Sequence, residues 1–327
     1  MRTVPAGSFE RLSSLEALWQ AWKRYRQGKR RQPRVAAFDR RAEHHVWRLH
    51  QALRAGHYRP GSMQVRLVRD PKLRLIAAAP IVDRVVHQAL VSALAPHIER
   101  RFIHHSYACG TGRGVHRAVL VHLGWMRAHR FRLGLDVAQF FASIPHDRLL
   151  TLLGRSVRDA RTLALCAALL SVGGAVYQTP LARSVAPEVD AGCGLALGTL
   201  LSQWSANVYL DGLDHFVKRT LKIGAYLRYM DDFTLFADRR EVLEDARASV
   251  ADWLSAERGL TLNPKRLAVR PTSVPCTWLG YRTSRAGLTP GRKMRRRMRR
   301  KLNAAAEQGD DALARTLAAT AAVVSFG

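Results

Sequence analysis

Cysteine is scarce in this chain, and the few cysteines are widely separated. The 327 residues include four of them, none in a CxxC pair: Cys109, Cys166, Cys193 and Cys276. A structural zinc site or a disulfide framework requires grouped cysteines, so neither is indicated. A reduced, cytoplasmic setting is therefore expected.

Acidic residues are also few. The sequence has 25 Asp and Glu against 53 Lys and Arg, which gives a formal net charge of +28 and a pI near 11.3. The hydrophobic fraction of 47% is ordinary for a globular protein and argues against a disordered polycation. A compact protein with this charge repels itself, and nucleic acid is the usual polyanion that compensates it. The excess of Arg over Lys has two explanations that both stay open, phosphate binding and a GC-rich genome.

Uninterrupted apolar runs are missing as well. The opening residues MRTVPAGSFERL lack the apolar core of a signal peptide. The most apolar stretch, residues 163–177, is shorter than the roughly 20 residues of a membrane span and contains Gly173 and Gly174. No membrane partner is expected.

The most informative feature that is present is a pair of adjacent acids in LRYMDDFTLFAD, residues 227–238. Asp231 and Asp232 lie between two strand-like segments, residues 225–230 and 233–237. The simplest interpretation is the tip of a β-hairpin, where Asp tolerates turn conformations and stays solvated. Taken alone, the pair would carry no chemistry.

A third acid changes this interpretation. RFRLGLDVAQFFASI predicts a short buried strand over residues 131–137 with Asp136 near its end. A carboxylate at the end of a core strand costs desolvation free energy unless it is paired or binds a cation. Three clustered carboxylates repel one another, and divalent cations make their joint ionisation favourable. The pattern suits two Mg²⁺ ions per site, with Mn²⁺ as the alternative, and in-line phosphoryl transfer.

The rest of the chain predicts several further elements. Residues 9–57 are helix-rich and basic, and SMQVRLVRDPKLRLIAAAP (residues 62–80) alternates like a hairpin with its turn at Asp70-Pro71. A Gly-rich loop precedes a polar-faced helix in GCGLALGTLLSQWSANVYL, a strand pair is expected around CTWLGYRTSRAGLT, and a basic helix follows. Basic residues on the first hairpin favour either a solvated strand face or a phosphate clamp.

The order of motifs resembles that of reverse transcriptases from bacterial retroelements, over roughly residues 10 to 310. LDVAQFFASI, LGTLLSQWSANVYL, YMDD and LNPKR are similar to four successive palm motifs, and WLGYR is similar to the primer-grip motif. YMDD alone is a weak signal, whereas five ordered motifs are specific. The resemblance implies an RNA-directed DNA polymerase, encoded by a bacterium or phage.

It also implies an α+β right-hand polymerase fold with fingers, a palm containing an antiparallel sheet, and a short helical thumb. The corresponding division is residues 1–93 and 144–201 for the fingers, 94–143 and 202–282 for the palm, and 283–327 for a basic thumb. The thumb is expected to be short because the sequence ends at Gly327 soon after the basic helix.

Residue roles follow from the same resemblance. The catalytic metal ligands would be Asp136, Asp231 and Asp232, with the carbonyl of Val137. Phe141 would be the steric gate that excludes a ribose 2′-hydroxyl. The remaining nucleotide-binding residues would be Lys72, Arg74, Leu197, Gly198, Gln203 and Lys265, the last as a proton donor to pyrophosphate. The residues expected at template and primer are Ser202, Asn207, Trp278, Leu279, Gly280, Arg292, Arg295 and Arg296.

Plain structural roles remain open for several of these. Phe141 could be core packing, Ser202, Gln203 and Asn207 could form an interhelical hydrogen-bond network, and Lys265 could be a solvated turn residue.

Within the family, the chain looks most like the enzymes of diversity-generating retroelements. LEALWQAWKRYRQGKRR, the SYAC turn, and SQ rather than SP in the second motif carry this likeness. In that group an aliphatic residue, here Leu197, replaces a glutamine and is associated with error-prone copying opposite template adenines. Ala196, Thr199 and Gln139 depart from the common pattern.

The likeness implies a template RNA, a primer, cDNA, deoxynucleotides and a small basic helical accessory protein that forms an oligomer. Alternative readings are a reverse transcriptase of phage defence, a group II intron-like enzyme, and a catalytically silent RNA-binding relative.

Overall fold

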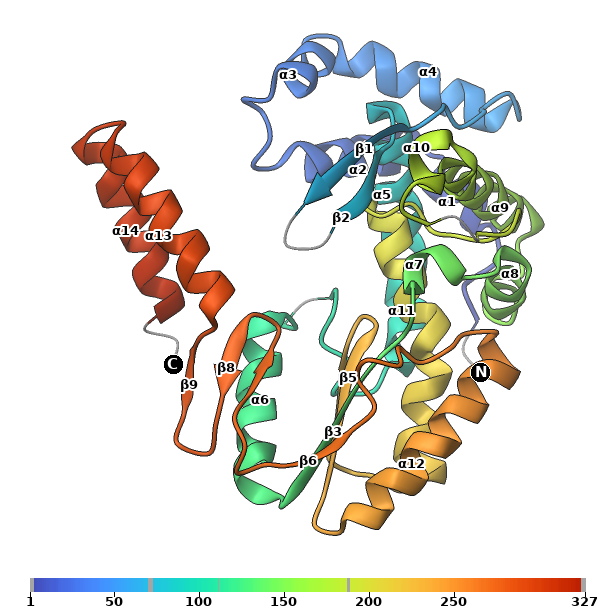
Figure 1. Cartoon of the computed structure of the whole chain (residues 1–327). Coiled ribbons are helices and arrows are strands. Elements are labelled where there is room, and N and C mark those ends of the chain that lie inside the picture. The colour runs from blue at the N-terminus through green and yellow to red at the C-terminus, as the bar shows by residue number, and fades with distance from the viewer. Residues whose placement is uncertain (1–2, 70–72, 111, 187–188, 325–327) are drawn as a thin grey trace. The chain divides into compact units, whose positions relative to one another are not determined.

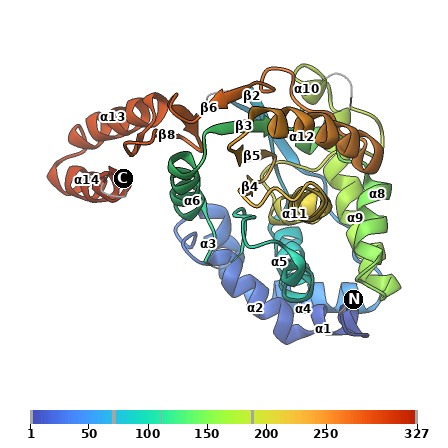
Figure 2. The same ribbon diagram turned by 90° about the horizontal axis from the view of Figure 1, so that it is seen from below.

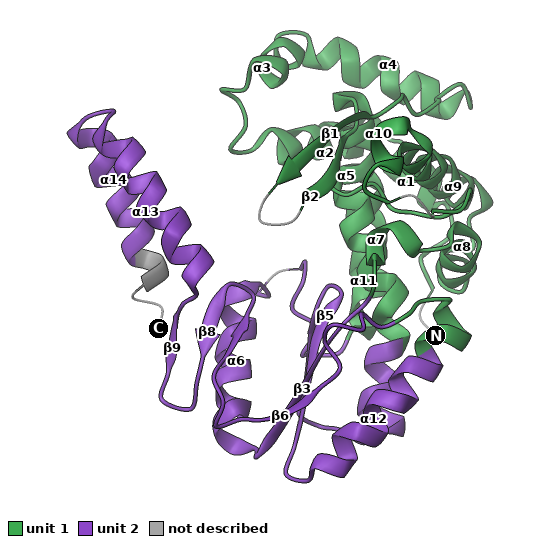
Figure 3. Ribbon diagram, in the orientation of Figure 1, with its two compact units in different colours: residues 1–102, 138–212, 254–261 green, residues 103–137, 213–253, 262–327 purple. Residues whose placement is uncertain are grey.

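The computed structural model describes residues 3–69, 73–110, 112–186 and 189–324, and the chain divides into two compact units. Unit 1 comprises residues 1–102, 138–212 and 254–261, and unit 2 comprises residues 103–137, 213–253 and 262–327. Figure 3 distinguishes the two units by colour. Each unit draws on three separate stretches of the sequence. The five-part division into fingers, palm and thumb stays a prediction.

Unit 1 is mainly helical. Its first stretch contains α1 (Ser8–Leu12), α2 (Leu15–Arg26), α3 (Pro33–Asp39), α4 (Ala42–Arg54), β1 (Gln64–Arg69), β2 (Leu73–Ala78), α5 (Ile81–Ile98) and a 3₁₀ turn (Glu99–Arg101). Its later stretches contain α7 (Phe140–Ser143), α8 (His146–Gly154), α9 (Ala160–Ala175), a 3₁₀ turn (Val176–Gln178), α10 (Pro180–Arg183), α11 (Leu200–His215), which ends in unit 2, and a π-helical turn (Leu254–Arg258).

The N-terminal helices form because apolar residues recur on one face and a cap starts the helix. Ser14 caps α2 by accepting a hydrogen bond from the Ala17 N–H at 3.2 Å. Leu18 and Trp22, four residues apart on one face of α2, are fully buried. α2 packs against α4 and α5, and these three helices lie together in Figure 2. The helix-rich N-terminal region is thus confirmed.

β1 and β2 form the predicted antiparallel hairpin. Val68 pairs with Arg74 and Leu67 with Leu75, so that Leu75 is buried and Arg74 is exposed on the alternate face. The turn at residues 70–72 lies outside the described residues.

One run in unit 1 is longer than the sequence indicated. α9 and the following 3₁₀ turn together span Ala160–Gln178, 19 residues with a mean hydropathy of 1.5, which is enough by length and composition to cross a membrane. Half of the run is buried inside the protein, and α9 packs against α8 and α1. A core helix passes the same test, so the run does not by itself indicate a membrane protein.

Unit 2 is built on a four-stranded antiparallel sheet of order β4-β5-β3-β6. The strands are β3 (Phe131–Asp136), β4 (Tyr226–Tyr229), β5 (Asp232–Ala237) and β6 (Val269–Pro271). α6 (Val115–Ala128) and α12 (Arg240–Trp253) cover opposite faces of this sheet, as Figure 1 shows. A π-helical turn (Phe216–Thr220) follows α11.

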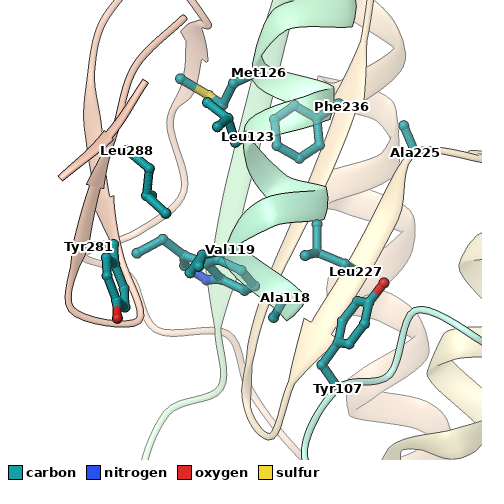
Figure 4. Packing of buried hydrophobic residues seen from close by; sticks show 11 residues of the cluster. Tyr107, Ala118, Val119, Leu123, Met126, Ala225, Leu227, Phe236, Tyr281 and Leu288 are labelled. Carbon is teal, nitrogen blue, oxygen red and sulfur yellow. The ribbon is translucent and has the colours of Figure 1, made fainter. Parts of the chain in front are cut away.

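Alternating side chains along β5 explain why both faces are covered. Phe236 packs with Leu123 and Met126 of α6 and with Leu227 of β4 in one buried cluster (Figure 4). Its neighbour Leu235, which is fully buried, points to the opposite face of the sheet. Apolar side chains therefore pack on both faces of the sheet.

The C-terminal part of unit 2 holds a smaller sheet and two helices. The expected strand pair is a three-stranded sheet of β7 (Cys276–Trp278), β8 (Tyr281–Thr283) and β9 (Leu288–Pro290). The basic helix is α13 (Arg292–Ala306), which packs against α14 (Asp310–Val324). The apolar face of α13 consists of Met294, Met298, Leu302 and Ala305, and its cations are exposed.

Candidate active site

The predicted acidic hairpin is present in unit 2. Tyr229 of β4 pairs with Asp232 of β5, which leaves Met230 and Asp231 as the two residues of the turn. Met230 adopts φ +56°, a left-handed conformation that is uncommon outside glycine. Asp231 therefore lies in a tight turn, and Asp232 begins the strand that follows it.

The register of the sheet brings the third acid to this hairpin. β3 and β5 are antiparallel, and Asp136 is the residue directly opposite Asp232. Directly opposed residues on antiparallel strands have Cβ atoms roughly 4.5–5.5 Å apart. Two acids that are 96 residues apart in sequence are thus neighbours in the fold.

Each of these two carboxylates accepts hydrogen bonds from nearby segments. Asp232 accepts from Trp278 Nε1 at 2.9 Å and from Arg266 Nη1 at 3.1 Å, one donor to each oxygen. Asp136 Oδ2 accepts from Asn263 Nδ2 at 2.9 Å. Burial raises the pKa of Asp232, Arg266 and Trp278 act to lower it, and Asp136 adds to the rise. The opposed pair is thus costly to ionise together without cations.

A buried ion pair contacts the turn between β4 and β5. The side chains of Arg228 and Asp214 are both 0% exposed and form two hydrogen bonds of 2.7 Å. Arg228 Nη1 also donates to the carbonyl of Met230 at 3.1 Å, and Tyr226 donates its hydroxyl to Asp214 at 2.7 Å. The guanidinium therefore ties the acidic turn to the end of α11.

This network was not anticipated from the sequence. Arg228 stands alone in an otherwise apolar strand, and Asp214 lies on the apolar helix NVYLDGLDHF. An arginine in one apolar segment and acids in another are a signal that could have found the pair, because a buried charge requires a partner.

The residues around this hairpin match a known family. The family model for reverse transcriptase (RNA-dependent DNA polymerase) matches residues 69–283. The chain belongs to the reverse transcriptase family. It carries a reverse transcriptase domain, an RNA-directed DNA polymerase, and the matched range includes all three acids.

Two curated relatives are distant. Protein YkfC of Escherichia coli is 24% identical over 279 residues, covering 72% of this chain and 70% of that protein. An uncharacterised 91 kDa protein in a cob intron of Schizosaccharomyces pombe is 29% identical over 136 residues, covering 42% of this chain and 16% of that protein. The names of these two relatives do not separate the subtypes of reverse transcriptase.

Solved structures show the fold alone. An apo telomerase from Candida tropicalis has a TM-score of 0.50 at 8% identity, covering 71% of this chain and 49% of that one. A telomerase from Candida albicans, in complex with a fragment of telomeric RNA, has a TM-score of 0.48 at 12% identity, covering 72% and 46%. The chain spans about half the length of these telomerases. The family match over residues 69–283, together with the similarity at a TM-score of 0.50, confirms the α+β polymerase fold.

The carboxylates suit a divalent metal in their chemistry. Reverse transcriptases generally use one, and Mg²⁺ prefers oxygen ligands such as carboxylates and backbone carbonyls. The predicted set of Asp136, Asp231, Asp232 and the Val137 carbonyl consists of such oxygen ligands, and the sheet register sets Asp136 opposite Asp232 beside the turn residue Asp231. Across the described parts of the chain, no three His, Cys, Asp or Glu side chains already stand close enough to hold an ion. Arg266 is the cation that Asp232 meets instead.

The predicted primer-grip residues form the β7–β8 turn of this reverse transcriptase. Leu279 and Gly280 both have positive φ, +48° and +88°, as a two-residue type I′ hairpin requires. The Gly280 carbonyl accepts from the Gly291 N–H at 2.8 Å, which joins this turn to the start of α13. Trp278 is 5% exposed and points its indole N–H at Asp232. In this structure it therefore serves the carboxylate.

The other predicted residues of unit 2 are at the surface. Lys265 is exposed, and its backbone N–H donates to Asn263 Oδ1 at 3.1 Å. Arg292, Arg295 and Arg296 are exposed on α13. Their roles toward nucleic acid stay predictions.

Unit 1 holds three of the predicted nucleotide-binding residues on two neighbouring segments. The Leu197 carbonyl accepts from the Ala77 N–H at 2.8 Å, which attaches the segment containing Leu197 and Gly198 to β2, the strand of Arg74. Gly198 has φ +116°, and a Cβ there would lie 2.8 Å from the Ala77 carbonyl oxygen. Glycine is thus required by this close approach of two backbone segments. Lys72 lies outside the described residues.

The remaining predicted positions are more enclosed. Phe140 is 2% exposed and fills the core, while Phe141 is half-buried, as the gate hypothesis needs. Ser202 and Asn207 are buried: Ser202 bonds the Thr199 hydroxyl at 2.8 Å, and Asn207 Nδ2 donates to the Gln203 carbonyl at 3.4 Å. These local bonds favour a structural role for Ser202 and Asn207. Gln203 itself is half-buried.

Proposed function

We propose that this reverse transcriptase makes cDNA from a template RNA by two-metal nucleotidyl transfer. The observation that carries the proposal is the register that sets Asp136 opposite Asp232, beside Asp231, within the family's matched range. Opposed carboxylates in one sheet are expensive unless cations are shared between them.

In the proposed reaction, each group of the chain has a defined task. Asp136, Asp231 and the Val137 carbonyl supply oxygen ligands, and Asp232 completes the acidic cluster. Bound divalent cations would lower the pKa of the attacking 3′-hydroxyl and neutralise the leaving pyrophosphate. Arg74, exposed on β2, would hold the triphosphate, since a guanidinium bonds phosphate oxygens in pairs.

The sugar and the leaving group involve two further residues. Phe141 would exclude the ribose 2′-hydroxyl. Its half-buried side chain supports that role, as does its contact with Phe140, whose ring centroid lies 5.4 Å from that of Phe141. Lys265 is exposed in the turn at residues 263–266, whose Asn263 and Arg266 bond the acids, and it would donate a proton to pyrophosphate.

We further propose that the enzyme is error-prone and belongs to a diversity-generating retroelement. Leu197 supports this subtype, because a branched aliphatic side chain removes the amide that would help to fix the nucleotide by hydrogen bonding. The template RNA, primer and deoxynucleotides would be joined by a small basic accessory protein oligomer, in the cytoplasm. The net charge of +28 supports the nucleic-acid partners.

The subtype is tested by copying a defined RNA template and sequencing the products. The unmodified enzyme should misincorporate mainly opposite template adenines, and Leu197→Gln should reduce those errors, whereas Leu197→Met, which keeps an aliphatic chain, should not. Equal error rates opposite all four template bases would contradict the retroelement assignment and favour a defence or intron-like enzyme.

A further inference from the structure

Two segments of unit 2 supply the hydrogen-bond donors to Asp232. No contact of either segment with this carboxylate was predicted from the sequence. One is the β7 strand, through Trp278, and the other is the turn at residues 263–266, through Arg266. Each oxygen of the carboxylate has its own donor, at 2.9 Å and 3.1 Å.

The position of Arg266 is set by its turn. Asn263 anchors the turn to the end of β3 through two bonds to Asp136, from its backbone N–H to the carbonyl at 2.7 Å and from Nδ2 to the carboxylate at 2.9 Å. The Arg266 N–H then closes the turn on the Asn263 carbonyl at 3.1 Å. Because Asp136 is opposite Asp232, a turn fixed on the first acid delivers its arginine to the second.

The two donors differ in how easily they can leave. Trp278 is 5% exposed, and its ring stacks on buried His122 with ring centroids 4.8 Å apart. Arg266 is 49% exposed, so its guanidinium can move into water at little cost. The indole is thus a permanent donor, and the guanidinium is an exchangeable cation.

We propose that Arg266 occupies the place of a divalent cation at Asp232 and is displaced when the metal binds, while Trp278 keeps the carboxylate oriented. The inference rests on the proposed two-metal function, since it assigns a competitor to the same carboxylates. Trp278 is then a positioning residue, and Arg266 is a competing cation that sets how tightly the site binds its metal.

The test is a Mn²⁺ titration of the purified full chain, followed by electron paramagnetic resonance, with no nucleic acid present. Arg266→Gln should bind Mn²⁺ about two- to fivefold more tightly than the unmodified protein, the size expected when a solvent-accessible ion pair is the competitor. Arg270→Gln is the matched control, because Arg270 is an exposed arginine of neighbouring β6 and loses the same charge. Trp278→Phe should bind Mn²⁺ more weakly.

The outcomes separate the inference from the function. Equal affinities for Arg266→Gln and Arg270→Gln, or weaker binding by Arg266→Gln, would overturn the role of Arg266 and leave the metal site standing. Mn²⁺ binding that is no stronger in the unmodified chain than in an Asp231→Asn, Asp232→Asn double variant would overturn the metal site and the inference together.

Discussion

At the scale of single residues, the acidic turn depends on a guanidinium that solvent does not reach. Arg228 bonds Asp214 twice and the Met230 carbonyl once, and both charged side chains are 0% exposed. Removing one partner of a buried pair leaves the other charge unpaired in a poorly solvated site, which costs far more than the pair itself contributes.

Arg228→Met should therefore destabilise the protein by about 3–5 kcal/mol. Arg240→Met is the matched control, because Arg240 pairs with Glu244 at 2.8 Å but is 55% exposed, and its loss should cost less than about 1 kcal/mol. Urea unfolding followed by circular dichroism measures both. Similar midpoints for the two variants would show that Arg228 has a minor structural role.

His122 gives stability a pH dependence. Burial lowers its pKa from 6.5 to about 3, with a smaller contribution from Arg132. Between pH 6.5 and pH 3, His122 binds a proton in the unfolded chain but stays neutral in the folded chain. The contribution of neutral His122 to the free energy of unfolding is therefore complete above pH 6.5 and is lost as the pH falls toward 3.

Replacing His122 by Phe keeps an aromatic ring against Trp278 and removes the titrating group. Between pH 6.5 and pH 3 the unfolding free energy of this variant should fall less steeply with decreasing pH, by at most about 1.4 kcal/mol per pH unit. Thermal unfolding at several pH values between 3 and 6.5 gives the slope of unfolding free energy against pH for both proteins. Parallel slopes for the variant and the unmodified protein would mean that His122 is protonated in the fold.

The sequence predicted the acids of the site but not their donors. Asp136, Asp231 and Asp232 could be recognised because their strands have clear apolar patterns and a known order of motifs. Asn263, Arg266 and Trp278 became donors to these acids only through tertiary pairing of turns and strands, which no local pattern encodes.

At the scale of elements, the Gly-rich loop before α11 is attached to β2 by a backbone hydrogen bond. Ala77 and Ala196 lie in one buried cluster, and the Ala77 N–H bonds the Leu197 carbonyl. The close approach at Gly198 leaves no space for a side chain.

Gly198→Ala should weaken this attachment by more than the about 1–2 kcal/mol that a positive φ alone costs. Gly192→Ala separates the two effects, because Gly192 has φ +82° with nothing within 4 Å of the added Cβ. Hydrogen exchange at the Ala77 amide reports the attachment directly. Equal protection of that amide in the two variants would argue against a clash at Gly198.

Elements with strong local patterns were predictable. The two hairpins followed from alternation, and most helices followed from apolar spacing. One detail differed: β9 added a third strand to the expected pair.

At the scale of the whole molecule, positive charge is concentrated on α13. Residues 292–301 of α13 carry eight Lys and Arg, all exposed: Arg292, Lys293, Arg295, Arg296, Arg297, Arg299, Arg300 and Lys301. A surface that neutralises phosphates makes binding depend steeply on salt.

Arg295→Gln with Arg296→Gln should reduce the slope of log affinity against log salt for template–primer duplex by about 1.5–2. Arg239→Gln with Arg240→Gln removes the same charge from an adjacent exposed pair on unit 2 and should leave the slope nearly unchanged. Fluorescence anisotropy at several salt concentrations gives the slopes. Identical changes in both double variants would mean that α13 has no special contact with the duplex.

Primer extension by the purified chain on an RNA template, with Mg²⁺ and deoxynucleotides, tests the catalytic assignment most directly. Extension should occur with the unmodified protein and with Asp245→Asn, an exposed acid of α12, and should be lost in Asp136→Asn and in the Asp231→Asn, Asp232→Asn double variant. Undiminished extension by either of the last two variants, or no extension by the unmodified protein, would contradict the assignment of these acids as the polymerase site.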